Sequence, residues 1–149
     1  MALAITTVTN SIAALAVTGL TIKDIDEIPT SVTDRICPIL YPEPLNFISD
    51  MTVERVTTGT AGSGYHDVYY TLRYAYLYQK VGTGRGSLRT YQGMVQLYED
   101  LIDKMIISDN ITGCVDIQVF GSVSFGPILD PAGEVFIGAE LLFRVHEFE

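Results

Sequence analysis

The stretch "YHDVYYTLRYAYLYQK" (residues 65–80) decides the fold of this chain. Every even position from Val68 to Tyr78 is a valine, leucine or tyrosine, whereas the odd positions include Asp67, Arg73 and Gln79. A period of two over so long a run predicts a β-strand with one apolar face. The tyrosines at 70, 74, 76 and 78 share that face. Because tyrosine suits both a core and a protein–protein contact, both locations stay open for them.

The segments that surround this strand predict the rest of the sheet. Residues 51–59 alternate more weakly and are expected to pair with 65–80 as a hairpin through a turn at 60–64. Two closing strands are predicted at 114–125 and 135–148, with 126–134 as a turn-rich connection between them. A short strand is expected within 20–28, and the prolines of 29–44 indicate an extended crossing or edge segment.

Two amphipathic helices complete the pattern. In the first, near the start of the chain, Ile5, Val8, Ile12 and Leu15 recur at helical spacing. The second is predicted over 87–109. Its apolar stripe is expected to be Leu88, Tyr91, Val95, Tyr98, Leu101, Ile102 and Met105. The sequence therefore predicts an α+β fold: a mostly antiparallel sheet with a long hairpin, packed on one side by two helices.

Composition limits the classes of function. The chain has 149 residues, of which 48% are hydrophobic, so a single domain spanning 1–149 is expected. Its formal net charge is −9, which disfavours binding to nucleic acid and to anionic membranes. No run of about 18 apolar residues predicts a membrane span. Cys37 and Cys114 stand far apart and predict free thiols in a reducing compartment.

The glycine-rich stretch "KVGTGRGSLRTYQ" (80–92) resembles a phosphate-binding loop only superficially. Its glycines are spaced GxGxG, and no Gly-Lys pair occurs in the chain, so neither nucleotide motif is present. Lys80, Arg85 and Arg89 instead make this stretch locally basic in an acidic chain. Two interpretations stay open for it: a solvated connection between strand and helix, or a loop that docks onto an acidic neighbour such as another copy of the protein. The best acidic acceptor in the sequence is the cluster Asp24, Asp26 and Glu27.

No catalytic, cofactor or metal site is predicted. His66 and His146 lack a cysteine or histidine partner at the spacing that a metal requires. His66 and Asp67 are adjacent on a strand, so their side chains point to opposite faces. The serines lack a GxSxG elbow. These absences predict that the protein is not an enzyme.

The order of several segments resembles that of the tail terminator (tail completion) proteins of long-tailed bacteriophages. These segments are "DIDEIPTSVTDRICPILYPEP", "YTLRYAYLYQKVGTG", "YQGMVQLYEDLIDKM" and "FGPILDPAGEVFIGAELLFRVHEF". The family has a helix, a proline-marked segment, a long hairpin, a second helix and closing strands. The resemblance covers nearly the whole chain. The positions that match the family's pattern are Pro29, Pro38, Pro42 and the turn 130–133.

The resemblance implies a structural role in the virion, at the junction of tail and head, after assembly in the host cytoplasm. Copies of the protein are expected to form a ring, a hexamer, that ends polymerisation of the tail tube. The implied partners are the tail tube protein and a head-completion or connector protein, and DNA would pass through the channel without sequence-specific binding. The head–tail joining neck proteins, which are similar in size and fold, give an alternative. A small-ligand binding domain with a pocket at the tyrosine-rich strand is a third interpretation.

Overall fold

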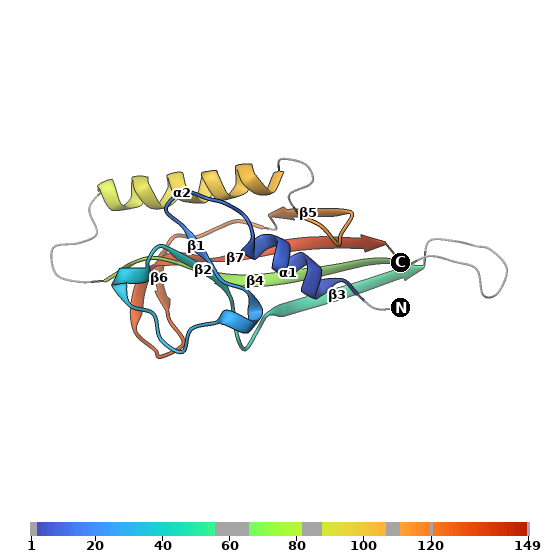
Figure 1. Cartoon of the computed structure of the whole chain (residues 1–149), viewed down its shortest axis with the longest axis horizontal. Coiled ribbons are helices and arrows are strands. Elements are labelled where there is room, and N and C mark those ends of the chain that lie inside the picture. Colours follow the sequence, from blue (N-terminus) through green and yellow to red (C-terminus); the bar gives the residue numbers. More distant parts are fainter. Residues whose placement is uncertain (1–2, 56–65, 82–87, 107–110, 120, 149) are drawn as a thin grey trace.

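The computed structural model describes residues 3–55, 66–81, 88–106, 111–119 and 121–148 (Figure 1). In this part of the chain, two helices and a seven-stranded, mostly antiparallel sheet form an α+β fold. The elements in chain order are α1 (Ile5–Ala13), β1 (Thr21–Ile22), β2 (Ile39–Pro42), β3 (Ile48–Arg55), β4 (His66–Lys80), α2 (Leu88–Ile106), β5 (Asp116–Val119), β6 (Gly126–Leu129) and β7 (Val135–Phe148). Two short 3-10 helices, η1 (Ile25–Glu27) and η2 (Asp34–Ile36), lie between β1 and β2.

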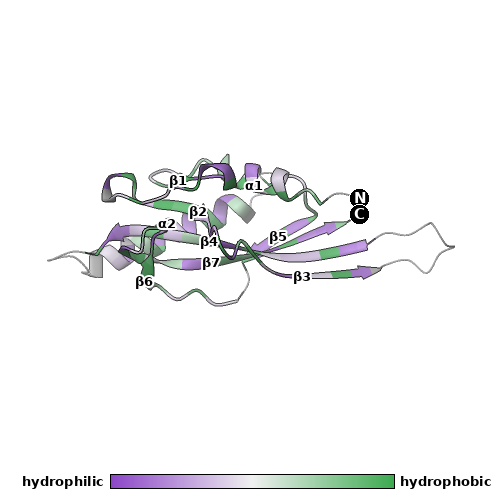
Figure 2. Cartoon of the chain, turned by 90° about the horizontal axis from the view of Figure 1, so that it is seen from below, coloured by the Kyte–Doolittle hydropathy of each residue, from purple (hydrophilic) through white to green (hydrophobic). Residues whose placement is uncertain are grey.

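The long strands β4 and β7 form the centre of the sheet. They run antiparallel from the pair Asp67–Phe148 to the pair Lys80–Phe136. β3 and β2 pair with successive halves of the other edge of β4, and β5 and β6 do the same for β7. The hairpin of 51–59 with 65–80 is confirmed as β3–β4, although β3 begins earlier, at Ile48. Figure 2 shows apolar and polar positions alternating along β3, β4 and β7.

Both helices cover the same face of the sheet, as the sequence predicts. Val8 and Ile12 of α1 and Met94, Leu97, Leu101 and Met105 of α2 join one core with the apolar faces of β4 and β7. The tyrosine-rich face belongs to this core: Tyr70, Tyr74 and Tyr76 are 0, 0 and 1% exposed. These three tyrosines therefore lie in the core rather than at a protein–protein contact. Tyr78, the fourth tyrosine of this face, is half-buried.

A second, smaller core lies on the opposite face, at one end of the sheet. Ile39, Tyr41, Ala75, Leu77 and Phe136 are buried there with Val32. The segment between η1 and β2 covers them, so only the rest of this face is open. The alternation along 135–148 groups Phe136 with polar residues, whereas this cover buries it completely.

Two expectations from the sequence are wrong in detail. The apolar stripe of the second helix is shifted, because Met94 and Leu97 are buried while Tyr91 and Val95 are exposed. The connection 126–134 contains strand β6, which pairs with β7. The short strand expected within 20–28 is confirmed as β1, which covers Thr21–Ile22 before η1 begins.

The proline-marked segment 29–44 also differs from its expected place. Its strand, β2, lies inside the sheet between β1 and β4 rather than at an edge, and it pairs in parallel with β1. Among the helices that the structure describes, none is long and apolar enough to cross a membrane.

Candidate functional site

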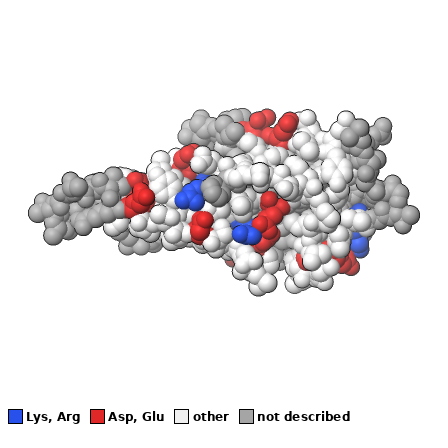
Figure 3. Space-filling view, turned by 180° about the vertical axis from the view of Figure 1, so that it is seen from behind, with Lys and Arg blue, Asp and Glu red and all other residues white. Residues whose placement is uncertain are grey.

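The open face of the sheet, opposite the helices, carries a network of polar side chains from β3, β4 and β7. Residues directly opposite one another on paired strands point to the same face, so the register brings these groups together. We call this set the polar ladder: Asp50, Asp67, Tyr69, Thr71, Arg73, Glu140, Arg144 and His146. Viewed from behind, acidic and basic side chains lie next to one another near the middle of the molecule (Figure 3).

One end of the polar ladder is a hydrogen-bonded histidine and aspartate. Nε2 of His146 lies 2.7 Å from Oδ1 of Asp67, and both side chains are about four-fifths buried. The Tyr69 ring stacks on the imidazole, with 4.4 Å between centroids and 7° between planes. This contact shields the pair on one side. The sequence alone does not reveal this pair, because Asp67 and His146 lie on different strands and meet only through the register of β4 with β7.

Arg144 forms the middle of the polar ladder. Its guanidinium lies 3.5 Å from a carboxylate oxygen of Asp50 and donates a hydrogen bond to the Thr71 hydroxyl at 3.3 Å. The Thr71 hydroxyl in turn donates to Asp50 at 2.8 Å. Arg144 also lies over the Tyr69 ring, 5.6 Å from its centroid, within the range of a cation–π contact. Three strands are therefore linked through a single arginine.

The other end of the polar ladder has two carboxyl groups near one arginine. Arg73 forms an ion pair with Glu140 at 2.7 Å. Glu43, in the connection after β2, is tied to the same strand because its amide donates to the Arg73 carbonyl at 3.0 Å. Burial, a hydrogen bond with Glu140 and the charge of Glu140 raise the pKa of Glu43 to about 7, although Arg73 acts in the opposite direction.

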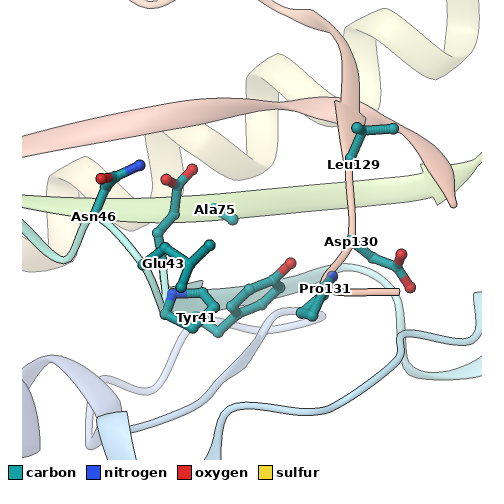
Figure 4. A pocket seen from close by; sticks show the side chains of 9 residues that line it. Tyr41, Glu43, Asn46, Ala75, Leu129, Asp130 and Pro131 are labelled. Carbon is teal, nitrogen blue, oxygen red and sulfur yellow. The ribbon is translucent and has the colours of Figure 1, made fainter. Parts of the chain in front are cut away.

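A cleft of about 420 Å³ opens beside Glu43 (Figure 4). Ala75 lines it from the central strand β4, while Pro44, Leu45, Leu129 and Pro131 supply apolar walls. The ring of Tyr41 extends into it, and its hydroxyl points toward the space between Ala75 and Leu129. The Tyr41 side chain is 1% exposed, and burial, followed by the charges of Asp130 and Glu43, raises its pKa above the usual range.

Asp130, which directly follows β6, lines this cleft and is held in place by two hydrogen bonds. One carboxylate oxygen accepts a hydrogen bond from the Glu134 amide at 2.7 Å, and the other accepts one from the Val32 amide at 2.9 Å. The first bond closes the turn before β7, in which Gly133 has a φ of +88° that glycine adopts readily. The second bond joins that turn to the segment covering the small core. Asp130 is therefore already committed to structural hydrogen bonds.

Of the basic residues that the sequence predicts for an interface, only Lys80 has a described side chain, and it lies outside the polar ladder and the cleft. Lys80 ends β4 and pairs with Glu134 of the same chain at 2.9 Å. Arg85 and the glycines of 82–86 lie outside the described residues, as does the turn 60–64, and only the backbone of Arg89 is described, within α2.

The acidic cluster expected as the acceptor has a local structural role. Asp24 caps η1: its side chain accepts a hydrogen bond from the Ile25 amide, and the Glu27 side chain accepts one from the Asp24 amide. Asp26 is exposed on the same short helix. Two of the three acids are thus committed to the cap and retain only part of their capacity for a partner.

The polar ladder is suited to binding a surface that carries its own pattern of charges. Each of its three basic side chains already has a carboxylate neighbour, so an isolated anion would compete with existing pairs. No group of three or more potential metal ligands occurs among the described residues. Comparison with protein-family models and with curated proteins found no match to this chain.

Proposed function

We propose that this protein is a structural component of a phage virion, whose copies form a ring on the end of the tail tube. The ring, a hexamer, ends tube polymerisation and joins the tail to the head connector. The proposal rests on the resemblance to tail terminator proteins. The observation that carries it is the order of the elements, in which α1, the proline-marked β2, the β3–β4 hairpin, α2 and closing strands follow one another. This is the order that the resemblance implies.

The surface of the sheet supports the same proposal independently. The helices bury one face, and the other carries the polar ladder, in which the side chains of Glu140 and Asp50 are exposed and the others are partly or fully buried. A subunit of a ring needs two different complementary surfaces, because each copy contacts the next head to tail. Charge pairs arranged in rows give such contacts a fixed register and suppress wrong ones. The net charge of −9 would keep a channel formed by such copies from retaining DNA.

Native mass spectrometry of the purified chain tests the proposal directly. A closed ring, with one discrete mass at six times that of the chain, is expected. A strict monomer over the whole accessible concentration range would contradict the proposal. Electron microscopy of tail tubes mixed with the chain should then show rings at one tube end. Binding to connectors without binding to tubes would favour a head–tail joining protein instead.

The basic stretch can be tested in the same assay. Reversing Arg85 and Arg89 to glutamate is expected to weaken ring formation while leaving the circular dichroism spectrum unchanged. One exposed ion pair contributes only about 0.2–1 kcal/mol, but a ring repeats the loss at every boundary. The matched control reverses Arg35 and Lys104, both exposed and outside the proposed contact. Equal assembly of both double variants would remove residues 80–89 from the interface.

A further inference from the structure

The cleft beside Glu43 has the features of a site that accepts one positively charged side chain. Glu43 lines the cleft, with Glu140 as its acidic neighbour and Arg73 as its basic neighbour. Paired carboxyl groups with a single counter-ion cannot both ionise without cost. Burial first, and the neighbouring Glu140 second, raise the pKa of Glu43, so it keeps its proton to higher pH than an isolated glutamate does. A second cation beside the two carboxyl groups would offset their repulsion, so Glu43 would lose its proton more readily.

An independent observation also points to a ligand at this place. The Tyr41 hydroxyl projects into the cleft and is accessible there, while the rest of the side chain is buried, and the described residues provide it with no hydrogen bond. The hydroxyl oxygen is therefore available to accept a hydrogen bond from a ligand. An oxygen that can accept a hydrogen bond, next to carboxyl oxygens, fits a donor-only group. Guanidinium and ammonium groups are donors only.

The walls of the cleft define the rest of the ligand. Pro44, Leu45, Leu129 and Pro131 are apolar, and Leu45 is 92% exposed while Leu129 is 60% exposed. Lysine and arginine place an apolar stem along such surfaces and extend the charge beyond it. The combination of apolar walls with carboxyl and hydroxyl oxygens therefore matches the two parts of a basic side chain.

We propose that this cleft binds a lysine or arginine side chain from an adjacent copy of the same chain. This inference rests on the proposed function, because it assigns one contact between ring subunits. A second copy suits the site for reasons of charge: the sequence concentrates three of its nine basic residues within 80–89. The acceptor is then the pair Glu43 and Glu140 rather than the cap residues Asp24 and Glu27.

Sedimentation velocity across pH tests the subunit contact. If the bound cation requires an ionised Glu43, the wild-type chain should associate about thirtyfold more tightly at pH 8 than at pH 5.5, since only the ionised fraction is competent. Glu43→Gln should associate about tenfold more weakly than wild type at pH 8 and lose this pH dependence. Glu99→Gln, on the exposed face of α2, is the matched control and should behave as wild type. Wild-type association by Glu43→Gln at pH 8 would overturn the inference.

A probe that does not depend on assembly separates this inference from the proposed function. N-acetyl-argininamide is titrated into protein diluted below its association midpoint, and the methyl signals of Ala75 and Leu129 are followed by NMR. Saturable shifts are expected at pH 8, absent with Glu43→Gln and absent with N-acetyl-norleucinamide, which has an uncharged side chain. Probe binding by a chain that never self-associates would support the site while contradicting the ring. A ring that assembles normally while the probe fails to bind would contradict the site alone.

Discussion

The hydroxyl of Tyr70 donates a hydrogen bond to the carboxylate of Glu147, and both side chains are buried. The other carboxylate oxygen of Glu147 accepts a hydrogen bond from the Ala4 amide at 2.7 Å, at the start of α1. One side chain of β7 therefore links the centre of β4 to the first helix. A carboxylate is also favourable at a helix N-terminus, where amide groups lack intrahelical partners.

Replacing Glu147 with alanine should lower the free energy of unfolding by about 2–4 kcal/mol, because the Tyr70 hydroxyl and the Ala4 amide both lose their acceptor. Glu147→Gln retains one acceptor oxygen and should cost less. Urea unfolding followed by circular dichroism measures both. In a double-mutant cycle with Tyr70→Phe, a coupling of about 1 kcal/mol or more is expected. Strict additivity would show that the two groups do not interact.

Glu43 should make the stability of the fold depend on pH. Its pKa is raised from 4.5 to about 7 in the folded protein, chiefly by burial and by Glu140. The folded state therefore favours the protonated form, so this stabilisation is complete below pH 4.5 and is lost as the pH rises through 7. Glu43→Gln removes this dependence. The variant should be more stable than wild type at pH 8, with little difference at pH 4.5.

Urea unfolding at pH 4.5, 6 and 8, with protein below its association midpoint, checks this difference. Glu99→Gln again serves as the control, because its exposed side chain should give the same small difference from wild type at each pH. A Glu43→Gln variant less stable than wild type at pH 8 would contradict the charge argument. A group that destabilises the isolated subunit but strengthens its association is expected of a binding site.

The central strands are predicted well from the sequence, because the alternation of apolar and polar residues depends only on residues that are close together in the chain. The alternation along 65–80 and 135–148 places Tyr70, Tyr74 and Leu141 on a single face, and the structure confirms it. Which face of α2 packs against the sheet is harder to predict. Apolar residues occupy a wide arc of this helix, so several stripes fit the sequence equally well. The close approach of Gly93 to the Tyr78 side chain shows which side faces the sheet.

The candidate site could not be predicted because each of its contacts joins distant parts of the chain. Glu43 lies between two prolines of the segment predicted as an extended crossing or edge, and its neighbour Glu140 is on the last strand. Strand β6 was missed for a related reason. Its glycine and proline resemble a turn, yet Pro127 is tolerated because β6 pairs with β7 along one edge only.

The buried tyrosines predict that the fold fails at alkaline pH. Burial is the first cause that raises the pKa of Tyr41, Tyr70, Tyr74 and Tyr76 above the usual value of 10. The folded state thus disfavours their ionised form, so their stabilisation is complete below pH 10 and is lost as the pH rises further. Absorbance at 295 nm measures tyrosine ionisation during an alkaline titration. The four buried rings should ionise only together with the loss of the circular dichroism signal. Titration of these four tyrosines near pH 10 with an unchanged spectrum would contradict this burial.

Gly138 is the position of β7 where the central pair of strands tolerates no side chain. A Cβ atom placed there would overlap the carbonyl oxygen of Tyr76, which is backbone and cannot rotate away. Gly138→Ala should therefore force β4 and β7 apart next to the register shift between Leu77 and Gln79, at a cost of about 2–4 kcal/mol. Gly126→Ala is the matched control, since a Cβ atom on this strand glycine meets nothing within 4 Å. Thermal unfolding of both variants decides the matter: Gly126→Ala should unfold close to the wild-type temperature, whereas Gly138→Ala should unfold well below it. Equal unfolding temperatures would mean that the two strands are not in contact at this point.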